Sequence, residues 1–293
     1  VTDVTYPACR NAADFVAHRS GAKVVVAELP FPCTDPQEIS DAIMSKVSDR
    51  TVLALLDHIT SSTALVLPLH DLVPRLDALG VDSLVDAAHA PGQVDVDLDA
   101  LGAAYSTGNC HKWLCSPKGA AYLHVRSDRQ GRVRPLTISH GASQDTSKKS
   151  RFRWEFDWTG THDPTAHLSV PAALTHMETL LEGGWPAIRE RNHHLALEAQ
   201  RILGPLLGQA EETPPELCGA MIAFPLPKEP PSLPESPYGM DPLAHWLWEK
   251  HRICVPVGPL PHARARFLRV SAQLYNRLED YERLAEALRQ VPI

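Results

Sequence analysis

Strand-like and helix-like segments alternate through the first half of this chain, and this alternation constrains the fold more than any other feature. Strand-like runs lie at 23–29 (KVVVAEL), 51–57 (TVLALLD), 103–107 and 120–125, and another ends at Asp86; helices are predicted over 8–20, 35–47 and 69–79. Such alternation predicts an α/β fold in which helices cover both faces of a mostly parallel sheet. Because ligands bind at the carboxyl ends of the strands in such sheets, polar residues just after strands are the functional candidates.

The second half of the chain has a different pattern. A polar segment over 126–162 is predicted to be an irregular loop, and the segment 212–242 holds nine prolines. Helices are predicted over 165–183, 185–207, 241–251 and 278–290, with strands near 252–257 and 266–271. We therefore predict a large domain over residues 1–165, and connecting helices with a smaller α+β domain over residues 166–293. In the helix predicted over 8–20, Phe15 and Val16 are expected on the apolar face.

Composition excludes several classes of function. The 293 residues are 44% hydrophobic, which is enough for a full core, and carry 28 basic against 35 acidic side chains. A net charge of −7 is a poor match for nucleic acid or an anionic membrane. No uncharged apolar run of about 18 residues occurs, so no transmembrane helix is expected, and the first residues do not resemble a signal peptide. Six irregularly spaced cysteines predict free thiols and a cytoplasmic protein.

An aspartate and a lysine stand out in the stretch 82–119. Asp86 ends a predicted strand, and Lys112 lies in a loop within His111-Lys112-Trp113. A lysine in a partly apolar pocket has a lowered pKa and can attack a carbonyl carbon. An aspartate at a strand end can keep a pyridine nitrogen protonated, so the pair is what a pyridoxal 5'-phosphate (PLP) enzyme requires. The spacing alone leaves open that both are ordinary residues of turns.

The residue identities carry a resemblance to a known family. Three segments match: VDAAHAPGQVDVDLDALGAAYSTGNCHKWLCSPKGAAYLHV at 85–125, WTGTHDPTAHLSVPAAL at 158–174 and FLRVSAQLYN at 267–276. They resemble the class V aminotransferase family of fold type I PLP-dependent enzymes, and within it the isopenicillin N epimerase-like branch. The resemblance runs from about Tyr6 to Tyr275 in the same order, and it implies the fold and the cofactor more specifically than the reaction.

The resemblance implies roles around the cofactor ring. Lys112 matches the lysine that holds PLP as an internal aldimine, and Asp86 matches the partner of the pyridine nitrogen. His89 matches a residue that touches the phenolic oxygen, although it could also be an ordinary core histidine. Tyr6 matches an aromatic residue stacked on the pyridine, although a position near the start of the chain could also be frayed. Trp113 is interpreted as a packing residue.

Further positions match residues around the phosphate and the substrate. Asn109 and His111 match polar residues that hold the phosphate, and Ser61 lies near a position that contacts the ring oxygen. Thr161 matches a residue that reaches the phosphate of the neighbouring subunit's cofactor, which implies a homodimer with shared active sites. Arg269 matches the arginine that binds a substrate carboxylate, a task that suits a bidentate guanidinium. A structural ion pair is the alternative for Arg269.

The chain departs from the family pattern in two places. Family members carry a further segment before the equivalent of Val1, with a small-residue turn that cradles the phosphate, so the N-terminal part of the family fold is expected to be missing. The related cysteine desulfurases use a cysteine on a loop that corresponds to 255–267, and no cysteine occurs there. Cys254 precedes this loop within an apolar run and is expected to be buried, which disfavours persulfide chemistry.

The implied function is a PLP-dependent enzyme that acts at Cα or Cβ of an amino acid or an amino-acid-derived substrate through Lys112. Epimerisation of the isopenicillin N type, C–S cleavage of a cysteine-derived sulfoxide and transamination all start from the same Cα carbanion, and the sequence does not decide among them. A shortened, non-catalytic relative is the alternative from another class. The sequence leaves the substrate open.

Overall fold

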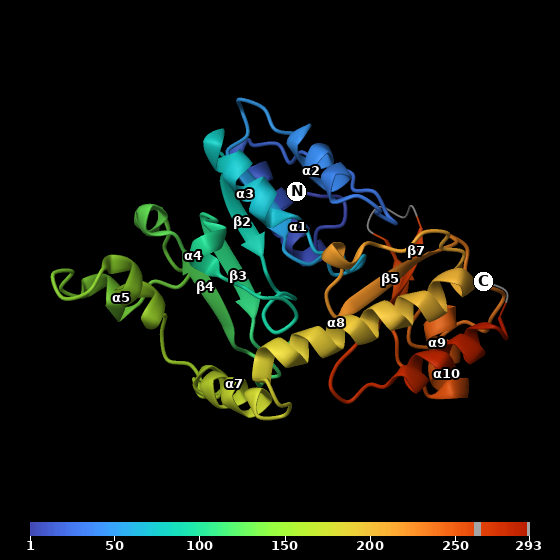
Figure 1. The fold of residues 1–293 in the computed structure, drawn as a ribbon. Helices are drawn as coiled ribbons and strands as arrows, with labels where there is room; N and C mark the ends of the chain where they lie inside the picture. The colour runs from blue at the N-terminus through green and yellow to red at the C-terminus, as the bar shows by residue number, and fades with distance from the viewer. Residues whose placement is uncertain (261–264, 292–293) are drawn as a thin grey trace.

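A four-stranded sheet forms the centre of the first half in the computed structural model, which describes residues 1–260 and 265–291 (Figure 1). The strand order is β1-β2-β3-β4, with β1 at Leu53–Asp57, β2 at Asp82–Asp86, β3 at Tyr105–Asn109 and β4 at Ala121–Val125. The first three strands are parallel, and β4 is antiparallel to β3. The predicted α/β fold with a mostly parallel sheet is confirmed, and it brings the carboxyl ends of β1, β2 and β3 to one edge.

Three helices of this half occur at the predicted places, and a short fourth helix was not predicted. These are α1 (Pro7–Ser20), α2 (Pro36–Met44), α3 (Leu69–Ala78) and the short α4 (Leu98–Leu101). Helix α2 begins where the sequence predicts, because the Asp35 carboxylate accepts a hydrogen bond from the backbone N–H of Gln37 at 2.8 Å. Helix α3 buries Leu72 and Leu76 fully in the core of this half.

Two predictions near the start of the chain are wrong. Phe15 and Val16 are 62% and 61% exposed, and α1 buries none of its residues. The run at 23–29 forms no strand, because its pairing with residues 1–5 amounts to one isolated bridge between Thr2 and Ala27. A β-branched run becomes a strand when a neighbouring strand pairs with it along its length, and residues 1–5 supply only one such bridge.

A second, antiparallel sheet lies in the other half of the chain. Its order is β5-β7-β6, with β5 at Met221–Leu226, β6 at Val257–Pro259 and β7 at Arg266–Ser271. The long helix α8 (Gly184–Leu203) packs on this sheet together with α9 (Pro242–His251) and α10 (Leu278–Leu288). Phe224 and Leu268 are fully buried in this second hydrophobic core. The first core also takes in Met221, so the division at residue 165 stays a prediction.

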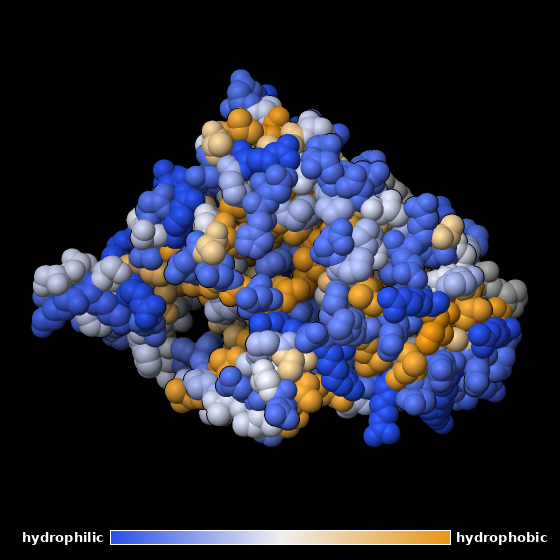
Figure 2. Space-filling model, viewed as in Figure 1, coloured by the Kyte–Doolittle hydropathy of each residue, from blue (hydrophilic) through white to orange (hydrophobic). Residues whose placement is uncertain are grey.

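The segment between the two sheets contains more structure than the predicted loop over 126–162. It forms two 3-10 turns and the helix α5 (Arg151–Asp157), which project to one side in Figure 1. Glu155 is only 1% exposed and forms ion pairs with Arg134 and Arg151, which hold this arm together. The arm is mostly polar in the space-filling view, whereas apolar residues are visible near the middle of the face that it shows (Figure 2).

The predicted helix over 165–183 is divided in two. It comprises α6 (Thr165–Leu168) and α7 (Val170–Glu178), with Pro171 in the first turn of α7, where its missing N–H is tolerated. The chain returns to the first sheet here, because Ala166 lies against Gly119 just before β4. Among the helices of the described residues, none has the length and apolar character that a membrane span requires.

Candidate active site

Two carboxylates meet where β1 and β2 end. Asp57 and Asp86 are the last residues of these strands and stand opposite one another in register. The backbone N–H of Ala88 donates to Asp86 Oδ1 at 3.0 Å, and the thiol of Cys9 on α1 donates to Asp86 Oδ2 at 3.2 Å. Burial and the neighbouring Asp86 raise the pKa of Asp57 to about 7. The strand ends therefore place the Asp86 carboxylate, together with the weakly acidic Asp57, on one side of the site.

Lys112, His89 and Trp113 form a continuous chain of contacts beside these carboxylates. Lys112 Nζ lies 3.2 Å from His89 Nε2, and the indole N–H of Trp113 donates to His89 Nδ1 at 3.3 Å. Residues 89 and 113 come from the loops that follow β2 and β3, so the parallel register brings them together. The structure thus assembles Asp86, His89 and Lys112, which the sequence analysis had placed around one ring.

The surroundings of Lys112 disfavour its charged form. Burial lowers the pKa of Lys112, and the cationic Arg269 lowers it further, whereas the carboxylate of Asp86 opposes this shift. Burial also lowers the pKa of His89 to about 3, with the charges of Lys112 and Arg269 acting in the same direction. His89 is therefore neutral at physiological pH, and the pKa of the Lys112 amine is shifted toward the range in which it acts as a nucleophile.

Tyr6 forms an aromatic wall next to the lysine. It immediately precedes α1, and the centroid of its ring lies 5.9 Å from Lys112 Nζ. The backbone of Tyr6 and the side chain of Thr5 lie close to the Asp57 carboxylate, where they oppose the rise that burial causes in the pKa of Asp57. The Tyr6 ring is 46% exposed, so one of its surfaces is free to stack against a flat ligand.

Arg269 reaches the site from the other half of the chain. It lies on β7, and its Nη1 donates to the backbone carbonyl of Ser61 in the loop after β1. Its Nε is buried and has no hydrogen-bond partner among the described residues. Burial lowers the pKa of Arg269, and its partner is a carbonyl rather than a carboxylate. A buried guanidinium with a free N–H fits a carboxylate supplied by a substrate.

The predicted phosphate ligands lie on and just beyond β3. Asn109 is the last residue of that strand, and His111 follows two positions later. The Nδ1 atom of His111 is buried without a hydrogen-bond partner in residues 1–260 and 265–291. Thr161 is exposed in the connection between α5 and α6, so its predicted contact with a neighbouring subunit stays a prediction.

These groups fit PLP on the evidence of their own chemistry. Lys112 offers an amine whose pKa is lowered by burial for the aldehyde carbon, and Asp86 offers a carboxylate for the ring nitrogen. The unpartnered His111 Nδ1 can face a phosphate, and the unpartnered Arg269 Nε can face a substrate carboxylate. Buried polar atoms usually have partners in folded proteins, so these two atoms, at residues 111 and 269, are available to a ligand.

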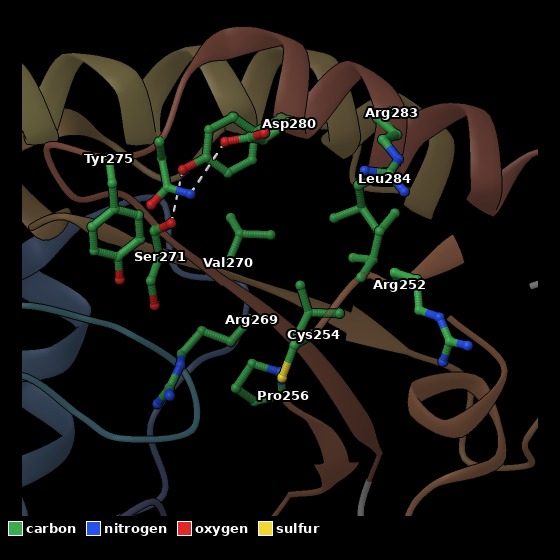
Figure 3. Close-up of a pocket in the computed structure, with 14 residues that line it drawn as sticks. Arg252, Cys254, Pro256, Arg269, Val270, Ser271, Tyr275, Asp280, Arg283 and Leu284 are labelled. Carbon is green, nitrogen blue, oxygen red and sulfur yellow. Dashed lines mark hydrogen bonds between the residues drawn. The ribbon is translucent and has the colours of Figure 1, made fainter. Parts of the chain in front are cut away.

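A pocket of about 310 Å³ lies next to this site, on the α10 side of β7. Figure 3 shows Arg252 and Arg283 around it, with the guanidinium of Arg269 pointing away from both. Cys254 is exposed and lines this pocket, so its predicted burial is wrong. The reason is that residues 253–255 lie between the end of α9 at His251 and the first paired residue of β6 at Val257, so the sheet does not cover them. Four residues of the loop 255–267 lie outside the described residues.

Sequence reasoning missed three residues of the site. Asp57 could have been found, because it ends a predicted strand next to the strand that ends at Asp86. Trp113 was interpreted only as packing, and it is indeed buried, but its N–H also contacts His89. Nothing in the sequence pattern pointed to Cys9, because its contact with Asp86 spans 77 positions of the chain.

Relatives of known name match nearly the whole chain. The chain is 35% identical over 296 residues to a probable chloroplastic L-cysteine desulfhydrase of Arabidopsis thaliana, which covers 97% of this chain and 61% of the relative. It is 36% identical over 305 residues to isopenicillin N epimerase of Amycolatopsis lactamdurans, which covers 99% of this chain and 73% of the relative. The chain thus spans about three fifths to three quarters of the length of these relatives.

Solved structures share the fold at lower sequence identity. The cysteine desulfurase CsdA of Escherichia coli superposes with a TM-score of 0.74 at 18% identity, covering 99% of this chain and 70% of that one. A cystine C–S lyase in complex with cysteine persulfide gives a TM-score of 0.74 at 19% identity, covering 100% and 74%. The profile of the aminotransferase class V family matches residues 1–284. This chain therefore belongs to the class V aminotransferase family, whose cofactor is pyridoxal 5'-phosphate.

Proposed function

We propose that this protein removes the Cα proton of an amino-acid substrate, with Lys112 as the cofactor-binding lysine and the base. The observation that carries the proposal is the position of the Lys112 amine, 3.2 Å from a neutral imidazole and beside the Asp86 carboxylate, with its pKa lowered by burial. An amine in this state can attack a carbonyl and can accept a proton near neutral pH.

Each neighbouring residue has a task in this reaction. PLP, when bound, supplies a conjugated ring that withdraws electrons from the substrate Cα. Asp86 keeps the ring nitrogen protonated, and Arg269 binds the substrate carboxylate and so orients the Cα–H bond toward Lys112. Tyr6 covers one face of the ring and excludes water from it. His89 donates its Nε2 proton to an oxygen on the ring, and His111 with Asn109 holds the phosphate.

Elimination of a β-substituent is the outcome that the site supports best. It needs a single base, because the proton that Lys112 takes from Cα can be passed to the departing sulfur. The similarity to proteins named L-cysteine desulfhydrase supports this outcome. We therefore propose a C–S lyase that acts on cysteine or a cysteine-derived amino acid.

Epimerisation is the second candidate, favoured by the 36% identity to isopenicillin N epimerase. This reaction needs a second proton donor on the face of the substrate opposite Lys112. The ring centroid of Tyr6 lies 5.9 Å from Lys112 Nζ. We therefore propose the phenol of Tyr6 as the candidate for this second proton donor.

The test uses the purified full chain with added PLP and L-cysteine in deuterated water. A C–S lyase releases sulfide and pyruvate, whereas an epimerase yields the D-enantiomer with deuterium at Cα, and a transaminase releases a keto acid that retains sulfur. Lys112→Ala should abolish every one of these products and the visible absorbance of the bound cofactor. Lys118→Ala is the matched control, because Lys118 is exposed six positions along the same loop. A chain that binds no PLP would be a non-catalytic relative.

A further inference from the structure

We propose that Trp113 is a positioning residue that fixes the proton of His89 on Nε2 and thereby holds Lys112 as the free amine. The geometry that carries this inference is the row of three side chains, in which Trp113 Nε1 lies 3.3 Å from His89 Nδ1 and Lys112 Nζ lies 3.2 Å from His89 Nε2. Its consequence for catalysis rests on the proposed function of Lys112.

The first step concerns the imidazole of His89. The indole N–H of Trp113 can only donate a hydrogen bond, so the His89 Nδ1 atom that faces it must accept. A neutral imidazole carries one proton, and with Nδ1 acting as the acceptor this proton lies on Nε2. The opposite tautomer would set two N–H donors against each other across 3.3 Å. Trp113 therefore selects one of the two tautomers.

The second step concerns Lys112. The N–H on His89 Nε2 points at the lysine nitrogen, so that nitrogen must accept a hydrogen bond. An ammonium group has three donors and no acceptor, whereas a neutral amine has a lone pair. The selected tautomer therefore stabilises the neutral amine, which is the form that attacks a carbonyl carbon. The same tautomer directs the Nε2–H of His89 at the position where Lys112 would meet its ligand.

The third step is that Trp113 cannot easily turn away. Trp113 is only 9% exposed, and its carbonyl oxygen lies 2.7 Å from where a side chain of Gly92 would begin. The turn from His89 to Gly92 therefore packs directly on the backbone of residue 113. The amide of Gln93 donates to the His89 carbonyl at 2.9 Å, which fixes the other end of this turn.

The charged groups around Lys112 have opposing effects on its protonation, so a single hydrogen bond can determine which form is favoured. Burial and Arg269 on β7 favour the neutral amine, whereas the carboxylate of Asp86 on β2 favours the ammonium, and Asp57 on β1 adds to this effect when it is ionised. Burial raises the pKa of Cys9 to about 12, so this side chain stays a neutral thiol. Because these effects oppose one another, one hydrogen bond from His89 measurably shifts the equilibrium between the neutral amine and the ammonium of Lys112. A hydrogen bond of ordinary strength corresponds to roughly a threefold to tenfold change in an equilibrium constant.

The test reads the tautomer and the lysine separately, in the protein without cofactor. Nitrogen-15 NMR of histidine-labelled protein reports which nitrogen of His89 carries the proton, with the His89 signals identified by their loss in His89→Gln. Competitive labelling of lysines with trace acetic anhydride across pH, read by mass spectrometry, reports the pKa of Lys112. We expect the Nε2–H form in the wild type. In Trp113→Phe we expect a mixture of both forms, a higher Lys112 pKa and about threefold to tenfold slower labelling at neutral pH.

Two further samples make the outcome decisive. Trp154→Phe is the matched control, because it removes an indole N–H that donates to the Asp145 carbonyl at 3.0 Å in the arm. If Trp113→Phe does not fold, replacing Trp113 by benzothienylalanine keeps the shape of the ring and removes only the N–H. A wild-type His89 protonated on Nδ1, or unchanged tautomer and lysine signals when the N–H is removed, would overturn the inference. Failure of the protein to bind PLP would instead count against the proposed function, because both readouts precede cofactor binding.

Discussion

Asp57 and Asp86 end neighbouring parallel strands in register, so two carboxylates share one edge of the sheet. Burial, followed by the charge of Asp86, raises the pKa of Asp57 to about 7. In the unfolded chain the Asp57 carboxyl ionises near pH 4. Between about pH 4 and pH 7 the folded protein therefore binds the additional proton, and its stability falls as the pH rises through this window.

Asp57→Asn removes this dependence, because an amide of nearly the same shape cannot ionise. We expect the variant to melt about 5 °C above the wild type at pH 8, with the difference shrinking toward zero at pH 4. Thermal unfolding followed by circular dichroism across this pH range measures the effect. Asp49→Asn, at an exposed turn, should show no such trend. A gain of equal size at both pH values would contradict the buried-acid interpretation.

Asp86→Ala should leave the protein able to bind the cofactor but make it a far poorer catalyst. The ring nitrogen loses its anionic partner, so the charge that develops at Cα is less well stabilised. We expect kcat to fall on the order of a hundredfold or more, with most of the cofactor retained in gel filtration. Cys9→Ser keeps a donor to Asp86 and should retain most of the activity. An unchanged kcat in Asp86→Ala would show that the residue only ends a strand.

Arg269→Lys should weaken substrate binding more than it alters the cofactor. Lysine keeps the positive charge but loses the planar pair of N–H donors that matches a carboxylate. We expect KM to rise about tenfold or more, while the absorbance spectrum of the bound cofactor stays close to that of the wild type. Arg252→Lys, in the pocket on the far side of β7, is the control and should leave KM unchanged. Equal effects on KM and on the spectrum would argue against a carboxylate clamp.

Thr161 and Lys112 should complement one another across a dimer. Thr161→Val should weaken cofactor retention without changing substrate affinity, because its hydroxyl is proposed to serve the neighbouring subunit's phosphate. Mixing Thr161→Val chains with Lys112→Ala chains should give heterodimers with one intact site, and roughly a quarter of the wild-type activity at equal proportions. Sedimentation establishes that both parents dimerise. No recovery of activity in dimers that do exchange subunits would remove Thr161 from the shared site.

Gly92→Ala should destabilise the loop that carries His89. Gly92 has φ +91, and a Cβ there would lie 2.7 Å from the carbonyl oxygen of Trp113. Backbone strain and this clash together should cost about 2 kcal/mol or more of unfolding free energy, measured by urea denaturation. Gly80→Ala is the matched control, since Gly80 has φ +73 with nothing within 4 Å, so it experiences the strain without the clash. Equal losses in both variants would show that the contact with Trp113 is unimportant.

The parts of the fold that sequence could predict are those set by local patterning. Apolar periodicity locates α3, and the Asp35-Pro36 pair locates the start of α2, because a cap and a proline act within one turn. The run at 23–29 has the same local character as a strand but pairs only at Ala27. Strand formation depends on a partner elsewhere in the chain, which local patterning does not reveal.

The residues of the site also differ in whether local sequence pattern could predict their positions. The placement of Asp86, His89 and Lys112 together follows from strand ends that meet at one edge of a parallel sheet. The contact of Cys9 with Asp86 depends on how a helix docks across 77 positions, and no spacing rule predicts it. The arm near α5 was predicted to be irregular because its stability comes from the buried Glu155 and its arginines rather than from an apolar face.

Because β4 runs opposite to β3, it begins at the end of the sheet that carries the site and finishes at the other end. Asn109 pairs with Ala121 at the edge that carries the site, and Tyr105 pairs with Val125 at the opposite edge, where the arm departs. The arm therefore departs from the sheet about a strand's length away from the carboxyl ends of β2 and β3. A reporter inserted on the arm side is therefore expected to leave the geometry around Lys112 unchanged. One strand that runs the other way thus keeps the attachment point of the arm apart from the residues that surround Lys112.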